Sequence, residues 1–321
     1  DRDILVWDIT KGEGESLQEL ETYFRQIWNE DCVQIKGGRK KNSSDISVSE
    51  EAADDSEGAE SNSKNSNIVN GIPNVENEIT DETQEKLSKY EKQYQSLEMR
   101  YASLKEKYTD IEDYSSWQED TIPANKITLV NNGTHAGPKT PLVLQTIRYL
   151  AQNAENVTIQ TPYVICNGYM YDTLNEIASH AQLKIILNAV EKGSNPWGCT
   201  DYLNQKKKIL NTGADVYELM NEVPVHTKAV LLDDRLSVVG SYNLDMRSTY
   251  LDTELMLVID SKELNQQIQS TEGTYIEKSK EVLSNGQETE GAQYETKELN
   301  WQKKLFYGVL RIIIRPLRQL L

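Results

Sequence analysis

The sequence of 321 residues has few cysteines, few histidines and no long apolar run. Its three cysteines, Cys32, Cys166 and Cys199, are scattered and odd in number. This pattern provides neither a zinc-binding spacing nor a disulfide framework, and it is typical of a reducing compartment. Because no apolar run reaches 18 residues, we expect no transmembrane helix in this sequence. We also find no signal-peptide pattern.

Basic residues are outnumbered, with 34 Lys and Arg against 51 Asp and Glu, which gives a net charge of −17. An extended nucleic-acid interface needs a basic face to neutralise phosphates, so we expect no nucleic-acid partner. The charge is uneven, however. Residues 42–80 hold nine acidic residues and one lysine, whereas residues 301–321 hold five basic residues and no acidic one. The acidic average therefore does not exclude a local basic patch.

The composition changes along the chain and divides it into parts. Residues 42–80 have no aromatic residue and are mostly Ser, Asn, Gly and acidic, so they cannot bury enough apolar area to offset the entropy of ordering. From about residue 122, short apolar runs alternate with helical patterns. We expect five parts: residues 1–35 with a strand over 3–8 and a helix over 16–29, a disordered acidic insertion over 36–80, a long helix and linker over 81–121, a second domain over 122–285 and a tail over 286–321.

The helix expected over 16–29 has Ser16 as its N-cap, Glu19 at the capping-box position and an apolar face of Leu20, Phe24 and Ile27. In the long helix, apolar residues recur at alternating spacings of 3 and 4. They are Leu87, Tyr90, Tyr94, Leu97, Tyr101, Leu104, Tyr108 and Ile111. This heptad seam indicates either a helix lying against its own domain, which we favour because the seam is rich in tyrosine, or a coiled-coil dimer.

Strands and helices alternate from residue 122 onward, which indicates a sheet covered by helices on both faces. We expect strands over 126–130, 157–160, 183–188, 216–219, 228–232, 237–239 and 254–259, and helices over 141–153, 170–180 and 203–211.

One motif carries the chemistry of the sequence. From His226 to Asn243 the chain reads HTKAVLLDDRLSVVGSYN, which contains HxK, an aspartate at Asp233, and then GSxN. Six fixed letters at this spacing arise by chance roughly once in 10⁷ to 10⁸ starting points. His226 and Lys228 are two residues apart near the start of a strand, so their side chains point to one face. Ser241 and Asn243 follow the next strand.

These residue types together indicate an anion site. An imidazole can act as a nucleophile or as a general acid and base. A lysine neutralises charge on a phosphoryl oxygen, and Ser and Asn donate hydrogen bonds that hold a phosphate.

The motif resembles the HKD motif of the phospholipase D superfamily, and it matches that motif letter for letter. The segment 244–255, together with QTPY at 160–163 and GSNP at 193–196, resembles bacterial cardiolipin synthase-like members. The likeness is good over 122–265, weak over 1–35 and hardly present over 36–121. It implies the phospholipase D-like α/β fold, a mixed β-sheet flanked by helices on both faces.

The resemblance also implies roles. The motif histidine, His226 here, attacks phosphorus or protonates the leaving oxygen, while Lys228, Ser241 and Asn243 hold the phosphate. A downstream glutamate, here Glu254, hydrogen-bonds the other ring nitrogen of the histidine. Asp233 is a candidate catalytic residue that is more often structural in the family. The mechanism uses no cofactor and no metal, and we find no metal-ligand cluster.

Family active sites combine two HKD motifs, one histidine forming the covalent intermediate and the other acting as the acid, and this sequence has one. His135 lies in a loop pattern and His180 ends an expected helix, so we interpret both as structural. We expect that the N-terminal half with the first motif is missing; the alternative is a homodimer that pairs two copies of His226. In the truncated case, His226 is the general acid and base.

The tail over 301–321 reads as a basic amphipathic helix. Lys304, Arg311, Arg315 and Arg318 share one stripe, Leu305, Val309 and Ile312 lie away from it, and Pro316 kinks or ends the helix. Such a helix suits an anionic membrane surface. The alternative is a helix packed on the domain.

The function expected from the resemblance is phosphatidyl transfer between phospholipids through a phosphohistidine, with phosphatidylglycerol as the substrate type, at the bacterial cell membrane. Two alternatives remain: phospholipase D-type hydrolysis by a lipase or nuclease, and a non-catalytic scaffold that keeps half a site.

Overall fold

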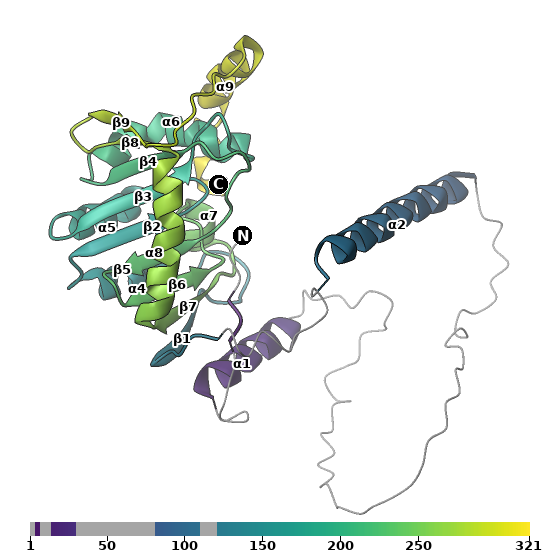
Figure 1. Ribbon diagram of the computed structural model, residues 1–321, viewed down its shortest axis with the longest axis horizontal. Helices are drawn as coiled ribbons and strands as arrows, with labels where there is room; N and C mark the ends of the chain where they lie inside the picture. Colours follow the sequence, from purple (N-terminus) through teal and green to yellow (C-terminus); the bar gives the residue numbers. More distant parts are fainter. Residues whose placement is uncertain (1–3, 7–13, 30–80, 110–120) are drawn as a thin grey trace, which may run out of the picture. The chain divides into compact units, whose positions relative to one another are not determined.

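The computed structural model describes residues 4–6, 14–29, 81–109 and 121–321, in two compact units (Figure 1). One unit joins the described residues before Val33 to those from Thr121 onward, and the other lies within Gln34–Asp120. The expected acidic insertion over 36–80 lies outside the described residues.

The second unit contributes one long helix, α2 (Asp81–Lys107), as the heptad pattern predicts. The seam side chains from Tyr90 to Tyr108 are exposed, from 38% at Leu104 to 64% at Tyr90 and Leu97. The seam thus presents a continuous apolar stripe, and its packing against its own domain or against a second copy stays a prediction.

The first unit is built on one mixed sheet of nine strands in the order β1-β7-β6-β5-β2-β3-β4-β8-β9. β2, β3 and β4 run parallel to one another, and the other neighbours are antiparallel. The strands are β1 (Lys126–Asn131), β2 (Asn156–Gln160), β3 (Gln182–Asn188), β4 (Asp215–Leu219), β5 (Ala229–Leu232), β6 (Leu236–Gly240), β7 (Leu255–Asp260), β8 (Ser279–Val282) and β9 (Glu288–Glu290).

Helices cover both faces of this sheet, which confirms the expected α/β fold (Figure 1). The helices of this unit are α1 (Glu15–Asn29), α4 (Leu142–Ala151), α5 (Gly168–Ala178), α6 (Pro196–Leu210), α7 (Met246–Tyr250), α8 (Lys262–Glu277) and α9 (Trp301–Ile313), followed by a 3₁₀ helix η1 (Arg315–Leu320). α8 packs on β4, β6 and β8, whereas α4 contacts β1 and β5, and α5 contacts β3.

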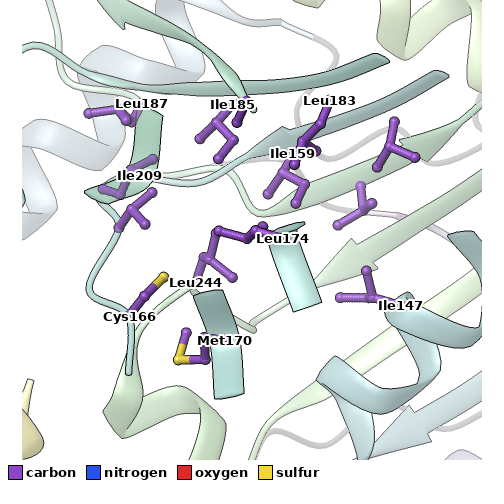
Figure 2. Packing of buried hydrophobic residues seen from close by; sticks show 14 of the residues in the cluster. Ile147, Ile159, Cys166, Met170, Leu174, Leu183, Ile185, Leu187, Ile209 and Leu244 are labelled. Carbon is purple, nitrogen blue, oxygen red and sulfur yellow. The ribbon is translucent and has the colours of Figure 1, made fainter. Parts of the chain in front are cut away.

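Alternation along the central strands explains the two layers. In β5, Ala229 and Leu231 face a small core with Ile268 of α8, whereas Val230 and Leu232 face the larger core on the other side. All four are buried, as expected for a strand covered on both faces. Figure 2 shows the larger core, where Ile159, Leu183, Ile185 and Leu187 of the sheet meet Ile147 of α4 and Met170 and Leu174 of α5.

Near the N-terminus, two expectations are wrong. Residues 4–6, the described part of the strand expected over 3–8, form no strand; Ile4 instead packs against the small core of α8. The helix expected over 16–29 is present as α1, but Ser16 lies inside it. Its hydroxyl donates to the carbonyl of Ile127, 2.6 Å away, so it joins α1 to β1 rather than capping the helix.

Later in the chain, α6 begins at Pro196, seven residues before the expected start, because Asn195 caps it and proline suits its first turn. The expected end of the tail helix near Pro316 is confirmed: α9 stops at Ile313 and η1 follows. Across the described ranges, no helix is both long enough and apolar enough to span a bilayer.

Candidate active site

The sheet topology brings several chain ends to one edge. Ala229 at the start of β5 lies opposite Val239 near the end of β6, and opposite Gln160 at the end of β2. Leu255 at the start of β7 lies opposite Asn131 at the end of β1. The residues just before β5, just after β6 and just before β7 therefore gather at this edge, although up to 28 positions separate them in the sequence.

His226 and Lys228 lie in the extended segment that leads into β5. Lys228 is buried, and its Nζ lies 2.9 Å from each ring nitrogen of His226. The same ammonium donates to the carbonyl of His226 at 2.6 Å. The two side chains therefore share one face, as their spacing predicts.

Ser241 and Glu254 are directly connected. The hydroxyl of Ser241 donates to the carboxylate of Glu254 and accepts from the backbone N–H of Leu255 at 3.0 Å. Gly240 permits this close approach, because a Cβ there would lie 2.1 Å from the carbonyl oxygen of Leu255. The bond from Glu254 to the ring of His226 that the family resemblance implies stays a prediction.

Behind these groups lies a layer of buried polar contacts on α7. Asp245 caps that helix by accepting from the N–H of Ser248 at 2.6 Å. The amide of Asn243 donates to the hydroxyl of Ser248 at 3.2 Å, and Asn132 donates to the carbonyl of Ser248 at 2.8 Å. Asn243 Oδ1 is buried and has no hydrogen-bond partner in the described part of the chain.

Burial and neighbouring charges shift the protonation of this cluster. Burial and the charge of Lys228 lower the pKa of His226, and burial lowers the pKa of Lys228 to about 8. Burial raises the pKa of Glu254 and raises that of Asp245 to about 6. At neutral pH the imidazole is thus held neutral beside an ammonium, a state in which it can attack or accept a proton.

These groups line one open cavity with a volume of about 600 Å³. Arg247 also lines it and pairs with Asp252, with Nε 3.0 Å from a carboxylate oxygen. The complete lining is His226, Thr227, Lys228, Gly240, Ser241, Asn243, Arg247, Asp252, Thr253 and Glu254. We call this cavity the HKD pocket. It contains five of the six candidate site residues.

The sixth, Asp233, is placed elsewhere, which corrects the expectation that it lines the site. It occupies the β5–β6 turn at the opposite end of β5, with a positive φ of 50°. Its carboxylate accepts from the N–H groups of Glu155 and Asn156, both at 2.9 Å. Asp233 thus ties the start of β2 to the hairpin.

The other two histidines are also away from the pocket. His135 Nε2 lies 3.2 Å from the carbonyl of Pro138, and His180 Nε2 lies 2.9 Å from the carbonyl of Ala151. Both rings contact backbone carbonyls and neither lines the pocket, so the HKD pocket contains a single imidazole from the described residues. These same residues form no cluster of His, Cys, Asp or Glu suited to a metal ion.

Sequence reasoning did not single out Arg247, Asp245, Ser248 or Asn132. For Asp245 and Ser248 a signal existed, since an aspartate three residues before a serine is a helix-capping pattern. Asn132 gave none, because its contacts to α7 span more than 110 residues of sequence.

The part of the chain that forms the HKD pocket resembles known proteins. A family model described as "Cardiolipin synthase, PLD-like domain" matches residues 146–271. Cardiolipin synthase A of Escherichia coli O157:H7 is 31% identical over 153 residues, which is 45% of this chain and 30% of that synthase. The Klebsiella pneumoniae enzyme of the same name is 30% identical over 142 residues, 43% of this chain and 27% of its own. The matches thus span under a third of these relatives' length.

Among solved structures, the Nuc protein of Salmonella typhimurium, a phospholipase D family member, aligns with a TM-score of 0.40 at 12% identity, covering 52% of this chain and 99% of Nuc. Phosphatidylserine synthase of Haemophilus influenzae aligns with a TM-score of 0.43 at 16% identity, covering 61% and 47%. The sequence match includes the whole run from His226 to Glu254. Residues 146–271 of this chain therefore resemble a phospholipase D-like domain of the cardiolipin synthase kind.

Proposed function

We propose that the HKD pocket takes part in phosphatidyl transfer between phospholipids, by way of a phosphohistidine intermediate. The observation that carries this proposal is the convergence of an imidazole, an ammonium, a hydroxyl and an amide on one open cavity. This set suits a phosphodiester, which needs a nucleophile, charge neutralisation and hydrogen-bond donors.

The proposed reaction has two displacements. A histidine nitrogen attacks the phosphorus of the donor lipid, a P–N bond forms, and the P–O bond to the headgroup alcohol breaks. A general acid gives its proton to the departing oxygen. An acceptor alcohol then loses its proton to the same group and attacks the phosphorus, and the P–N bond breaks.

The chain's own residues have separate roles in this scheme. Lys228 lies beside the imidazole at 2.9 Å and balances the charge of the phosphoryl oxygens. Ser241 and Asn243 orient those oxygens. Glu254, which accepts from Ser241, stabilises the protonated imidazole.

The scheme needs two histidines, and the described part of the pocket offers one. We therefore propose that a second imidazole comes from another phospholipase D-like half, or from a second copy of this chain. With a separate first half, His226 is the general acid and base. No cofactor or metal has a role in the proposal.

The substrate class follows from the relatives named cardiolipin synthase. We propose phosphatidylglycerol, both as donor and as acceptor, at a bacterial cell membrane. Two phosphatidylglycerol molecules then yield one cardiolipin and one glycerol.

The products identify the reaction. The complete protein is incubated with phosphatidylglycerol vesicles, and the lipids are separated by thin-layer chromatography and identified by mass spectrometry. Cardiolipin with glycerol supports transfer. Phosphatidic acid with glycerol means that water is the acceptor, so transfer is wrong while the phosphodiester chemistry stands. Absence of both products contradicts the proposal.

A further inference from the structure

The C-terminal segment presents a large apolar surface to solvent. Eight apolar side chains of α9 and η1 are each at least 40% exposed, with Trp301 at 73% and Ile312 at 69%. We call them the C-terminal apolar face: Trp301, Leu305, Phe306, Val309, Ile312, Ile313, Leu317 and Leu320. Contiguous exposed apolar patches of this kind mark interaction sites.

This face lies opposite the side by which α9 docks on the domain. Tyr307, Leu310 and Ile314 are buried, and α9 packs along α6. Trp301, Leu305, Val309 and Ile312 are spaced 4, 4 and 3 and lie on the outer side. The helix therefore has two apolar sides, and packing on the domain accounts for only one.

The basic side chains that the sequence analysis placed on a lipid-facing stripe fall into two groups, those that bond to the domain and those that are exposed. Arg318 makes two hydrogen bonds, at 2.7 and 2.9 Å, to Asp201 of α6, whose side chain is fully buried. Arg311 donates to Asn204 at 3.0 Å. These two hold the segment on the domain. Lys303 and Arg315 are exposed, whereas Lys304 pairs with Glu298 at 3.3 Å; residues 301–321 themselves contain no acidic side chain.

The segment is also attached to the HKD pocket. η1 packs against α7, and the backbone carbonyl of Leu321 accepts from the N–H of Arg247 at 2.8 Å. Arg247 lines the pocket. The C-terminal apolar face is thus continuous, through η1, with a wall of the candidate active site.

We propose that the C-terminal apolar face docks the domain on a phospholipid bilayer by inserting at the level of the headgroups. Exposed aromatic and aliphatic side chains beside the exposed basic residues Lys303 and Arg315 suit an anionic lipid surface better than they suit a protein partner. The choice of a bilayer also rests on the proposed function, since a pocket for lipid headgroups needs its substrate at the membrane surface.

The test measures binding of the full chain to vesicles of phosphatidylglycerol and phosphatidylcholine in equal parts. Leu305→Glu with Val309→Glu places two carboxylates on the C-terminal apolar face. We expect the vesicle partition coefficient to fall at least tenfold. The matched control, Leu142→Glu with Tyr149→Glu, changes two exposed apolar residues of α4 and should bind like the wild type. Equal binding by wild type and the α9 variant overturns the proposal.

Two further measurements keep this proposal separate from the proposed function. His226→Ala should bind vesicles as the wild type does, so retained binding without turnover supports docking even if the pocket performs another reaction. A wild type that forms cardiolipin but does not bind vesicles overturns docking alone. Light scattering detects the remaining case, in which the wild type is a dimer, the α9 variant is a monomer and neither binds vesicles. That result would assign the C-terminal apolar face to a second copy and overturn the proposal of bilayer docking.

Discussion

Lys228 sets the electrostatics at the reacting end of the pocket. Its ammonium lies 2.9 Å from both ring nitrogens of His226. Burial and the charge of this ammonium lower the pKa of His226, and burial lowers the pKa of Lys228 to about 8. The neutral imidazole and the charged ammonium therefore coexist over a limited pH range. In the proposed mechanism, that range bounds the pH at which the pocket has both a neutral imidazole and a charged lysine to hold the phosphate.

We predict a bell-shaped pH dependence of kcat/KM for the complete protein, since kcat/KM reports the free enzyme. Where His226 is the nucleophile its ring must be neutral, so the acid limb should have its midpoint below pH 6.5. Where His226 is instead the general acid of the first step, the protonated ring is required, and the rate should fall as the pH rises through that same lowered pKa. Above about pH 8 Lys228 loses its charge, and the rate should fall.

The control for the alkaline limb is Lys228→Arg, because arginine keeps its charge at all accessible pH values. It should move that limb upward by more than one pH unit, even if the maximal rate is lower. An acid midpoint above 6.5 in the wild type, or an alkaline limb that Lys228→Arg leaves in place, would show that these two groups do not govern the profile.

Asp233 belongs to the same motif but acts on stability. We predict that Asp233→Ala lowers the free energy of unfolding by about 1.5 kcal/mol, because two backbone donors lose their acceptor. Its positive φ of 50° also suits aspartate better than alanine. Urea denaturation followed by circular dichroism measures this change.

The neighbouring Asp234 is the matched control, since it is exposed and pairs only with Lys262 at the surface. The free energy of unfolding of Asp234→Ala should be close to that of the wild type. Activity of Asp233→Ala should stay within threefold of the wild type, and a loss of a hundredfold or more at unchanged fold would return Asp233 to the catalytic residues.

The motif spacing predicted four of the pocket residues, and the family resemblance added Glu254. A hairpin places the start of one strand beside the end of the next, so His226, Lys228 and Ser241 had to meet. The same arithmetic separates Lys228 from Asp233, since five residues of extended chain span about 16 Å. The protonation states could not be predicted, because they depend on burial and on the charges of Asp245 and Glu254.

At the scale of elements, the C-terminal helices are fixed to α6 by a buried charge pair. Asp201 is completely buried, and Arg318 is its cationic partner. A buried carboxylate that loses its partner is strongly destabilising. We predict that Arg318→Ala lowers the free energy of unfolding by about 3 kcal/mol, measured by urea denaturation.

Arg315→Ala is the control for this element, because Arg315 is an exposed arginine on the same turn. Its free energy of unfolding should equal that of the wild type. If Arg318→Ala is as stable as Arg315→Ala, then the Arg318–Asp201 pair does not hold η1 in place.

Elements with clear apolar periodicity were predicted, and polar ones were not. Strands β2 to β5 were found within one residue of each end, because their apolar runs are buried on both faces. α8 was missed, since only a few of its residues, such as Asn265, Ile268 and Glu272, are buried. β9 has no apolar residue, and only its pairing with β8 at the sheet edge makes it a strand.

At the scale of the whole molecule, the chain brings one imidazole to a site whose proposed chemistry needs two. We predict that a monomer of these 321 residues turns over phosphatidylglycerol at less than 1% of the rate of an assembly with a second histidine. Turnover and light scattering at matched concentrations check this. Full turnover by a population that is monomeric throughout would contradict the need for a second histidine.

The net charge of −17 is an average over a chain whose charge is unevenly distributed. Residues 42–80 supply −8 of that charge and residues 301–321 supply +5, whereas the HKD pocket is mixed, with Lys228 and Arg247 beside Asp252 and Glu254. The cationic excess therefore lies in the C-terminal segment, where the proposed docking needs an anionic lipid surface.

The central claim is that His226 performs the chemistry of the HKD pocket. Its most direct test is the initial rate of phosphatidylglycerol conversion by the complete protein carrying His226→Ala, with circular dichroism confirming the fold. The account predicts at least a thousandfold loss of rate at unchanged secondary structure. A rate within tenfold of the wild type would contradict it.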